Sequence, residues 1–203
     1  KIILIISIMK EEVVSFITTF MNDAVKKRNH PMHNLTIATI KDAKYPRLRN
    51  VVIRYFDADQ KIIRFHADVR APKVNEMIEN NQVEISCYDY NSKIQLRFAS
   101  VARVHHQNNM TKQIWLKTPS LGRRCYLQEF APSQILTTDQ YNNLKNFYSK
   151  TYSKEENEDG YKNFVVVECL FKEVDFLQLS IKGHKRYRIT FDDKDYQQMV
   201  LAP

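Results

Sequence analysis

The alternation of apolar and polar residues divides the first half of the chain into one helix and a run of short strands. Apolar residues recur at helical spacing from Glu11 to Arg28, which predicts a helix over 11–28 that ends before Pro31. Alternating or β-branched runs predict strands at 35–40, 49–56, 62–66, 83–88 and 94–104, with a short helix at 72–79. Strands joined by short turns indicate an antiparallel meander or barrel.

The second half adds helices and further strands. Helices are expected at 108–117 and from Thr138 or Asp139 onward, separated by a long loop over 118–134. A polar, acidic loop at 153–160 precedes strands expected at 164–171, 174–181 and 187–191. No repeat or flexible linker interrupts this pattern. We therefore expect a single, mainly β domain over 1–203, with its core at about 11–191 and helices at its periphery.

The first nine residues, KIILIISIM, are apolar but too few to span a bilayer. No small-residue cleavage site follows them, so a signal peptide is not favoured. We expect a tail or short strand that packs on the rest of the protein, and no membrane partner.

Charge and cysteine content narrow the class of partner. The net charge of +8 and a pI near 9.3 favour an anionic partner: nucleic acid, a membrane surface or a phosphorylated small ligand. Charge alone does not choose among the three. Three widely spaced cysteines form neither a disulfide framework nor a metal clip, which indicates a reducing, cytoplasmic setting.

Several common sites are not supported by the sequence. The histidines lack zinc-site spacing, so no metal is expected. The chain has neither a GxSxG elbow nor a GxGxxG motif, and its three dispersed glycines cannot build a P-loop.

Basic residues gather where one strand ends and a helix begins. In RFHADVRAPKV, residues 64–74, Lys73 follows Pro72, and Ala71 in the capping position cannot accept a hydrogen bond through its side chain. Pairing of strands 49–56 and 62–66 as a hairpin brings Arg49 to this turn. Free N–H groups and cations together describe a phosphate pocket. The alternative is a solvated turn whose charges only aid solubility.

Four segments resemble the pyridoxamine 5′-phosphate oxidase-like family of FMN-binding split barrels. They are RNVVIRYFD, RFHADVRAPKVNEMIENNQVEISCYD, IQLRFASVARV and, near the C-terminus, FLQLSIKGHKRYRITF. The likeness runs from about residue 34 to 104 and then resumes in the last segment. It implies a six-stranded antiparallel split β-barrel and a homodimer with FMN bound between the protomers.

The resemblance also implies the cofactor contacts. Positions that match the family's FMN residues are Arg49, Asn50, Val51, Val52, Ile53, Arg54, His66, Ala67, Ala71, Lys73, Gln95, Phe176 and Arg186. Of these, Arg49, Lys73 and Arg186 correspond to phosphate ligands, and Gln95 to a glutamine beside the flavin ring, where an amide can both donate and accept. The family usually carries Ser or Thr near positions 67 and 71, where this chain has alanine.

The same resemblance assigns the substrate side to Arg54, Lys182 and His184, with Trp115 in place of a substrate tyrosine. The function it implies is an FMN-dependent oxidoreductase acting on a small phosphorylated or other organic substrate. Two alternatives remain open at this point: a non-catalytic flavin-binding or interaction module, suggested by Ala67 and Ala71, and a basic nucleic-acid binder. The last lacks a recognition helix, stacking motif or zinc module.

Overall fold

A computed structural model describes residues 2–150, 152–192 and 195–203. Its described part contains one antiparallel sheet of eight strands in the order β3-β2-β1-β4-β5-β6-β7-β8. The strands are β1 (Asn34–Lys41), β2 (Tyr45–Asp57), β3 (Ile62–Asp68), β4 (Gln82–Asp89), β5 (Ile94–His106), β6 (Phe164–Gln178), β7 (Lys185–Phe191) and β8 (Tyr196–Val200).

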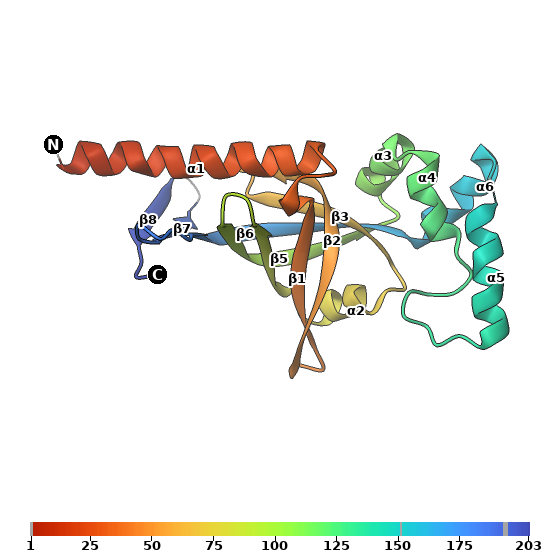
Figure 1. Ribbon diagram of the computed structural model, residues 1–203. Helices are drawn as coiled ribbons and strands as arrows, with labels where there is room; N and C mark the ends of the chain where they lie inside the picture. Colours follow the sequence, from red (N-terminus) through yellow and green to blue (C-terminus); the bar gives the residue numbers. More distant parts are fainter. Residues whose placement is uncertain (1, 151, 193–194) are drawn as a thin grey trace.

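One long strand closes this sheet into a barrel. The first half of β6 pairs with β3, from Asp68 opposite Phe164 to Ile62 opposite Leu170, while its second half pairs with β7. Strands β1 to β6 therefore form a closed six-stranded barrel, and β7 and β8 extend it at one end (Figure 1). The mainly β, six-stranded antiparallel split barrel expected from the sequence is confirmed.

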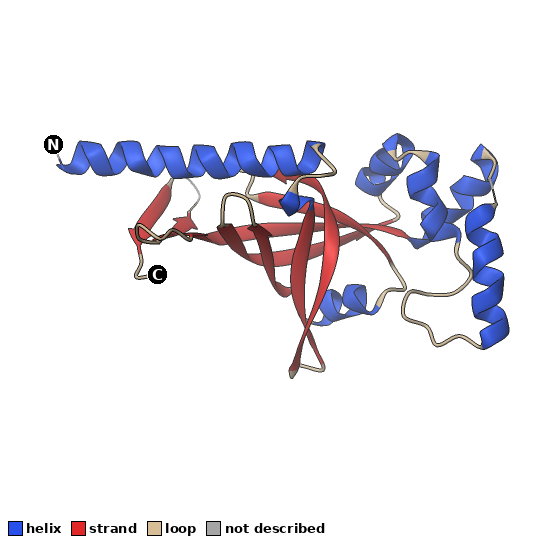
Figure 2. Cartoon of the chain, in the orientation of Figure 1, coloured by secondary structure: helices blue, strands red, loops and turns tan. Residues whose placement is uncertain are grey.

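Helices surround the barrel without entering it (Figure 2). Helix α1 lies along one side and buries Ile17, Met21 and Ala24 against the barrel core. Helix α2 begins directly after β3, and the remaining helices gather at the end opposite β8. The bounds are α1 (Ile2–Lys26), α2 (Pro72–Glu79), α3 (Asn109–Lys117), α4 (Ser120–Arg123), α5 (Thr138–Ser149) and α6 (Lys154–Glu158), with 3-10 turns at Pro31–His33, Arg124–Leu127 and Asp159–Asn163.

Several elements differ from the sequence-based expectation. The predicted N-terminal tail or strand is helical, because α1 begins at Ile2 rather than near Glu11. The predicted acidic loop contains α6, where the Ser153 side chain accepts from the Glu156 backbone N–H in a capping box. The two strands predicted at 164–181 are one continuous strand, β6, and β8 was not predicted.

Within the described residues, no helix is long and apolar enough to cross a membrane.

Candidate functional site

The N-terminus of α2 is open, as the sequence predicted. Ala71 provides no side-chain cap, and Pro72 starts the helix. Lys73 is half-buried, and its ammonium makes no hydrogen bond or ion pair with any described residue. Burial lowers the pKa of Lys73, and the nearby Arg49 guanidinium lowers it further. Arg70 is not available to a ligand in the same way, because its guanidinium donates two hydrogen bonds to the Asp68 carboxylate, at 2.7 and 3.0 Å.

Arg49 reaches α2 from the neighbouring strand, as the predicted hairpin required. Its Nη2 donates to Glu76 Oε2 at 2.7 Å, and its Nη1 donates to Arg47 O at 2.8 Å and to Thr39 Oγ1. Glu76 also accepts from Arg47 Nη1 at 3.0 Å and from the Thr39 hydroxyl. Arg47, Arg49 and Lys73 surround the Glu76 carboxylate, and the other nearby carboxylate, Asp68, is bound by Arg70. The cluster therefore keeps an excess of positive charge and suits a phosphate.

The strand motif after Arg49 presents two faces. Val51 and Ile53 point into the barrel and are buried, whereas Asn50, Val52 and Arg54 point outward. Ala67 and Ala71 are also buried, at 5% and 1% exposure. Their side chains belong to the core, so only the backbone of these buried residues can border a ligand.

A cleft of about 730 Å³ opens over the outer face of β2 and β3, against α3 and α4. It brings together three predicted residues, Val52, Arg54 and His66. A β-bulge between Ile53 and Tyr55 allows Tyr55 to face the cleft beside Arg54. Sequence reasoning missed the remaining walls, which come from segments far apart in the chain and include Arg28, Arg64, Ile114, Lys117, Leu121, Cys125 and Tyr126.

The cleft is cationic. Every charged side chain among the described residues that line it is an arginine or lysine. Arg64 is partly neutralised by Glu168, with Nε and Oε2 2.7 Å apart, and stacks 4.4 Å from the Tyr55 ring centroid. Burial lowers the pKa of His66 to about 4, so its ring is neutral at pH 7. An anionic ligand is therefore favoured over a cationic one.

The C-terminal part of the predicted site lies on other strands. Gln95 on β5 pairs with Leu177 on β6, and Leu177 pairs with Arg186 on β7. Cross-strand partners share a face, so these three residues form one row on the outside of the sheet. Arg186 is held there by Asp175, at 2.8 and 3.1 Å.

Phe176 does not join this row. It pairs with Tyr187, points into the barrel and is 6% exposed, with its ring 6.1 Å from that of Phe16 on α1. Phe176, which matches an FMN residue of the family, therefore packs in the core of its own chain, and Leu177 occupies the outward position beside Arg186. The outward position of Leu177 could have been found from the sequence, because side chains alternate between the two faces of a strand and the hairpin turn fixes which residue lies opposite Arg186.

Lys182 and His184 lie in the exposed turn between β6 and β7. His184 Nδ1 accepts from the Ser180 backbone N–H at 3.0 Å, and Gly183 between the two residues has a φ of +114°, which favours glycine. This turn is at the β7–β8 end of the barrel, whereas Arg54 lines the cleft beside α3 and α4 (Figure 1). One chain therefore does not bring the three predicted substrate residues together.

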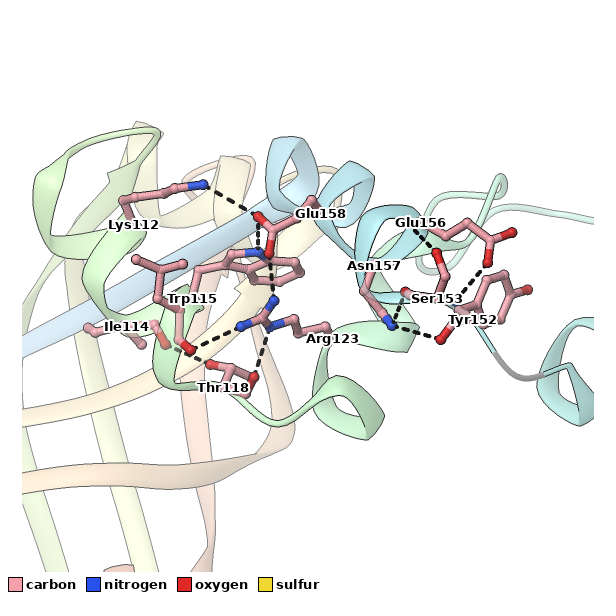
Figure 3. Close-up of polar contacts among 11 residues, drawn as sticks. Lys112, Ile114, Trp115, Thr118, Arg123, Tyr152, Ser153, Glu156, Asn157 and Glu158 are labelled. Carbon is pink, nitrogen blue, oxygen red and sulfur yellow. Dashed lines mark hydrogen bonds and ion pairs between the residues drawn. The ribbon is translucent and has the colours of Figure 1, made fainter.

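Trp115, expected to replace a substrate tyrosine, is fully buried. Figure 3 shows its indole Nε1 donating to Glu158 Oε2 at 3.1 Å. Arg123 donates to Glu158 Oε1 at 2.6 Å and to the carbonyls of Leu116 and Thr118 at the end of α3. Trp115 thus anchors the cleft wall, and its buried side chain does not face the cleft as a substrate residue would.

The predicted cofactor residues therefore form two sets on one chain. Through β3, the Val52 region of β2 lies level with Val167 on β6, because Ile53 pairs with Phe65 and Phe65 pairs with Val167. Arg186 pairs with Leu177, ten residues further along β6, which at about 3.3 Å per residue is roughly 30 Å, more than a flavin ring system spans. The residues near α2 and the cleft fit the phosphate and one face of FMN, and the row on β5 to β7 fits a second chain's contribution.

Comparison with known proteins supports this reading of the fold. Residues 14–106 match the family described as pyridoxamine 5′-phosphate oxidase, FMN-binding domain. No curated protein matches the sequence.

Two solved structures are similar in fold. One is a pyridoxamine 5′-phosphate oxidase-related, FMN-binding protein from Nostoc punctiforme, with a TM-score of 0.74 and 18% identity over 93% of this chain and 96% of that one. The other is PhzG from Burkholderia lata in complex with tetrahydrophenazine-1-carboxylic acid, with a TM-score of 0.72 and 14% identity over 94% and 92%. Arg49, Lys73 and Gln95 all lie within the segment that matches the pyridoxamine 5′-phosphate oxidase, FMN-binding domain family, and the chain as a whole has the split-barrel fold of these two structures.

Proposed function

We propose that this protein is an FMN-dependent oxidoreductase that works as a homodimer. The observation that carries the proposal is the open N-terminus of α2, where the unpaired ammonium of Lys73 lies beside Arg49 within the segment that matches the family. FMN supplies hydride or electron transfer when it is bound, and the protein supplies binding, orientation and electrostatics.

The phosphate is bound at α2. Lys73 offers an ammonium with no competing partner among the described residues, and Arg49 retains N–H donors beyond the three engaged by Thr39, Arg47 and Glu76. Backbone N–H groups in the first turn of α2 add to this attraction. Charge-assisted hydrogen bonds of this kind are the strong ones, so the phosphate group contributes much of the affinity for FMN.

The ring is bordered by both protomers. On one side lie the backbone around Val52 and the neutral ring of His66, which donates or accepts a hydrogen bond without adding charge. On the other lie Gln95 and Leu177 of a second copy, and Arg186 of that copy is the third cation expected at the phosphate. A two-fold axis places the row of each chain against the cleft of the other, so that a dimer has two equivalent sites.

The substrate is a small phosphorylated or other organic anion. Arg54 in the cleft binds its negative group, and Lys182 and His184 reach it from the second copy. In this proposal the protein resides in the cytoplasm, since the free thiols of Cys87, Cys125 and Cys169 suit a reducing compartment.

The test is a flavin titration of the purified protein. We expect flavin absorbance in the range of roughly 350 to 500 nm, and FMN to bind more tightly than riboflavin because only FMN carries the phosphate. A molar mass measured by light scattering should be twice that of the chain. Protein that binds neither flavin, over a range that saturates a known FMN protein, refutes the proposal.

A non-catalytic flavin-binding module is the second candidate. It is favoured by Trp115, which packs in the core instead of facing the cleft, and by the alanines at 67 and 71. Bound FMN that nicotinamide cofactors and small-molecule reductants fail to reduce, together with a specific protein partner, would favour this module over the enzyme. A nucleic-acid binder ranks below both, and salt-sensitive retention of nucleic acid is its test.

A further inference from the structure

Glu76 is a buried carboxylate in the middle of the proposed phosphate site. It lies one helical turn after Lys73 on α2, and its side chain is only 6% exposed. Three groups donate to it: Arg47, Arg49 and the hydroxyl of Thr39, which is itself fully buried. Burial works to raise the pKa of Glu76, but the hydrogen bonds from Thr39 and Arg49 outweigh it and lower the pKa, so Glu76 is ionised at neutral pH.

An ionised carboxylate on Arg49 competes with a phosphate for the same guanidinium. We infer that Glu76 is a specificity-determining residue of this site, one that lowers its preference for phosphate-bearing ligands and thereby lets the protein exchange FMN with solution. The inference rests on the proposed function. It deepens that function, because a site with Lys73 and Arg49 but no Glu76 would hold the phosphate much more firmly.

Two other observations point in the same direction. Arg70, the remaining cation of the β3–α2 turn, is already neutralised by Asp68. Ala71, at the helix cap, offers no hydroxyl to a phosphate. Among the described residues of this turn, Lys73 is therefore the cation that no carboxylate binds. Because so few cations are left for the phosphate, the negative charge of Glu76 has a large relative effect on phosphate affinity.

Coulomb's law sets the size of the effect. The N–H groups of Arg49 that remain free are on Nε and Nη2, and Glu76 binds the other N–H of Nη2 with Nη2 and Oε2 2.7 Å apart, so a phosphate on the free donors lies about 7 Å from the Glu76 carboxylate. At an effective dielectric constant between that of a protein surface and water, removing one unit charge at this distance changes affinity about tenfold. Riboflavin has no phosphate, so its affinity should not change.

The experiment measures Kd for FMN and for riboflavin by fluorescence titration of the flavin-free protein. The quantity of interest is the ratio of the riboflavin Kd to the FMN Kd. Glu76→Gln should raise this ratio about tenfold through the FMN Kd alone. Glu156→Gln, the same substitution on an exposed carboxylate of α6, is the matched control and should leave the ratio within about twofold of wild type.

Two further variants separate charge from geometry and guard against misfolding. Thr39→Val removes a contact of Arg49 without removing a charge, so the ratio should again stay within about twofold. Arg47→Gln, at a side chain that is 44% exposed, leaves Glu76 more fully engaged with Arg49 and should lower the ratio about threefold.

The outcomes distinguish this inference from the proposed function. Wild-type protein that binds neither flavin refutes both. Wild-type protein that prefers FMN, with a ratio in Glu76→Gln that is unchanged or lower, refutes the inference alone. The inference alone is also refuted if Thr39→Val raises the ratio as much as Glu76→Gln does. That result would mean that the ratio depends on freeing Arg49 from its contacts and not on removing a charge. If Glu76→Gln does not fold, a ratio in Arg47→Gln that is unchanged or higher refutes the inference instead.

Discussion

The orientation of Phe176 and Leu177 can be tested by truncating each side chain. Phe176 is 6% exposed, and its ring packs 5.9 Å from that of Tyr187 in the barrel core. Core Phe→Ala substitutions cost about 3–5 kcal/mol, and a hollow of about 330 Å³ beside Phe176 lets its neighbours relax, so we expect about 3 kcal/mol for Phe176→Ala. Leu177 is half-buried on the outer face, and Leu177→Ala should cost about 1 kcal/mol.

The assay is guanidinium chloride unfolding of the flavin-free protein, compared at constant m-value. The milder Phe176→Leu keeps the core filled and should leave the FMN Kd unchanged. Leu177→Ala should weaken FMN and riboflavin alike, because it removes a ring contact and not a phosphate contact. Equal losses of stability at the two positions, or a loss of flavin binding in Phe176→Leu alone, would contradict the orientation described above.

Three other predictions concern single side chains. Lys73→Met should raise the FMN Kd at least about tenfold with little change for riboflavin, as measured by the same titration. The folded-state pKa of His66, about 4, lies below its ordinary value of 6.5, so the stability it contributes is complete above pH 6.5 and is lost as the pH falls toward 4. This loss is about 3 kcal/mol and should be absent in His66→Gln when unfolding is followed from pH 7 to 4. Glu158→Gln weakens the contacts with Trp115 and the buried Arg123, and should cost about 2 kcal/mol in thermal unfolding; an unchanged Tm would argue against the anchoring role of this pair.

Most of the barrel was predictable because its strands carry local signals. Leu35, Ile37, Val51 and Ile53 alternate with polar or outward-facing residues, and the turns between strands are short. The open cap of α2 was predictable for the same reason, since Ala71 and Pro72 are adjacent in sequence. Features fixed within a few residues can be read from one sequence.

Features set by partners far along the chain were not predictable in the same way. Arg49 was expected near α2, but nothing local indicated that Glu76 would share it. The continuity of β6 past Lys172 and Glu173 depends on pairing with β5, and the inward direction of Phe176 follows from that register. The composition of the cleft depends on α3 and α4 folding back over β2.

The pairing of β3 with β6 has a consequence for how the protein folds. Ile62 pairs with Leu170, 108 positions later in a chain of 203 residues, so the barrel closes only after β6 has joined the segment that carries Arg49 and Lys73. Residues 14–106 alone would leave the β3 and β5 edges unpaired, and such edges invite association with other chains. We therefore expect slow, late closure governed by this long-range pairing, and aggregation of any fragment that stops before β6.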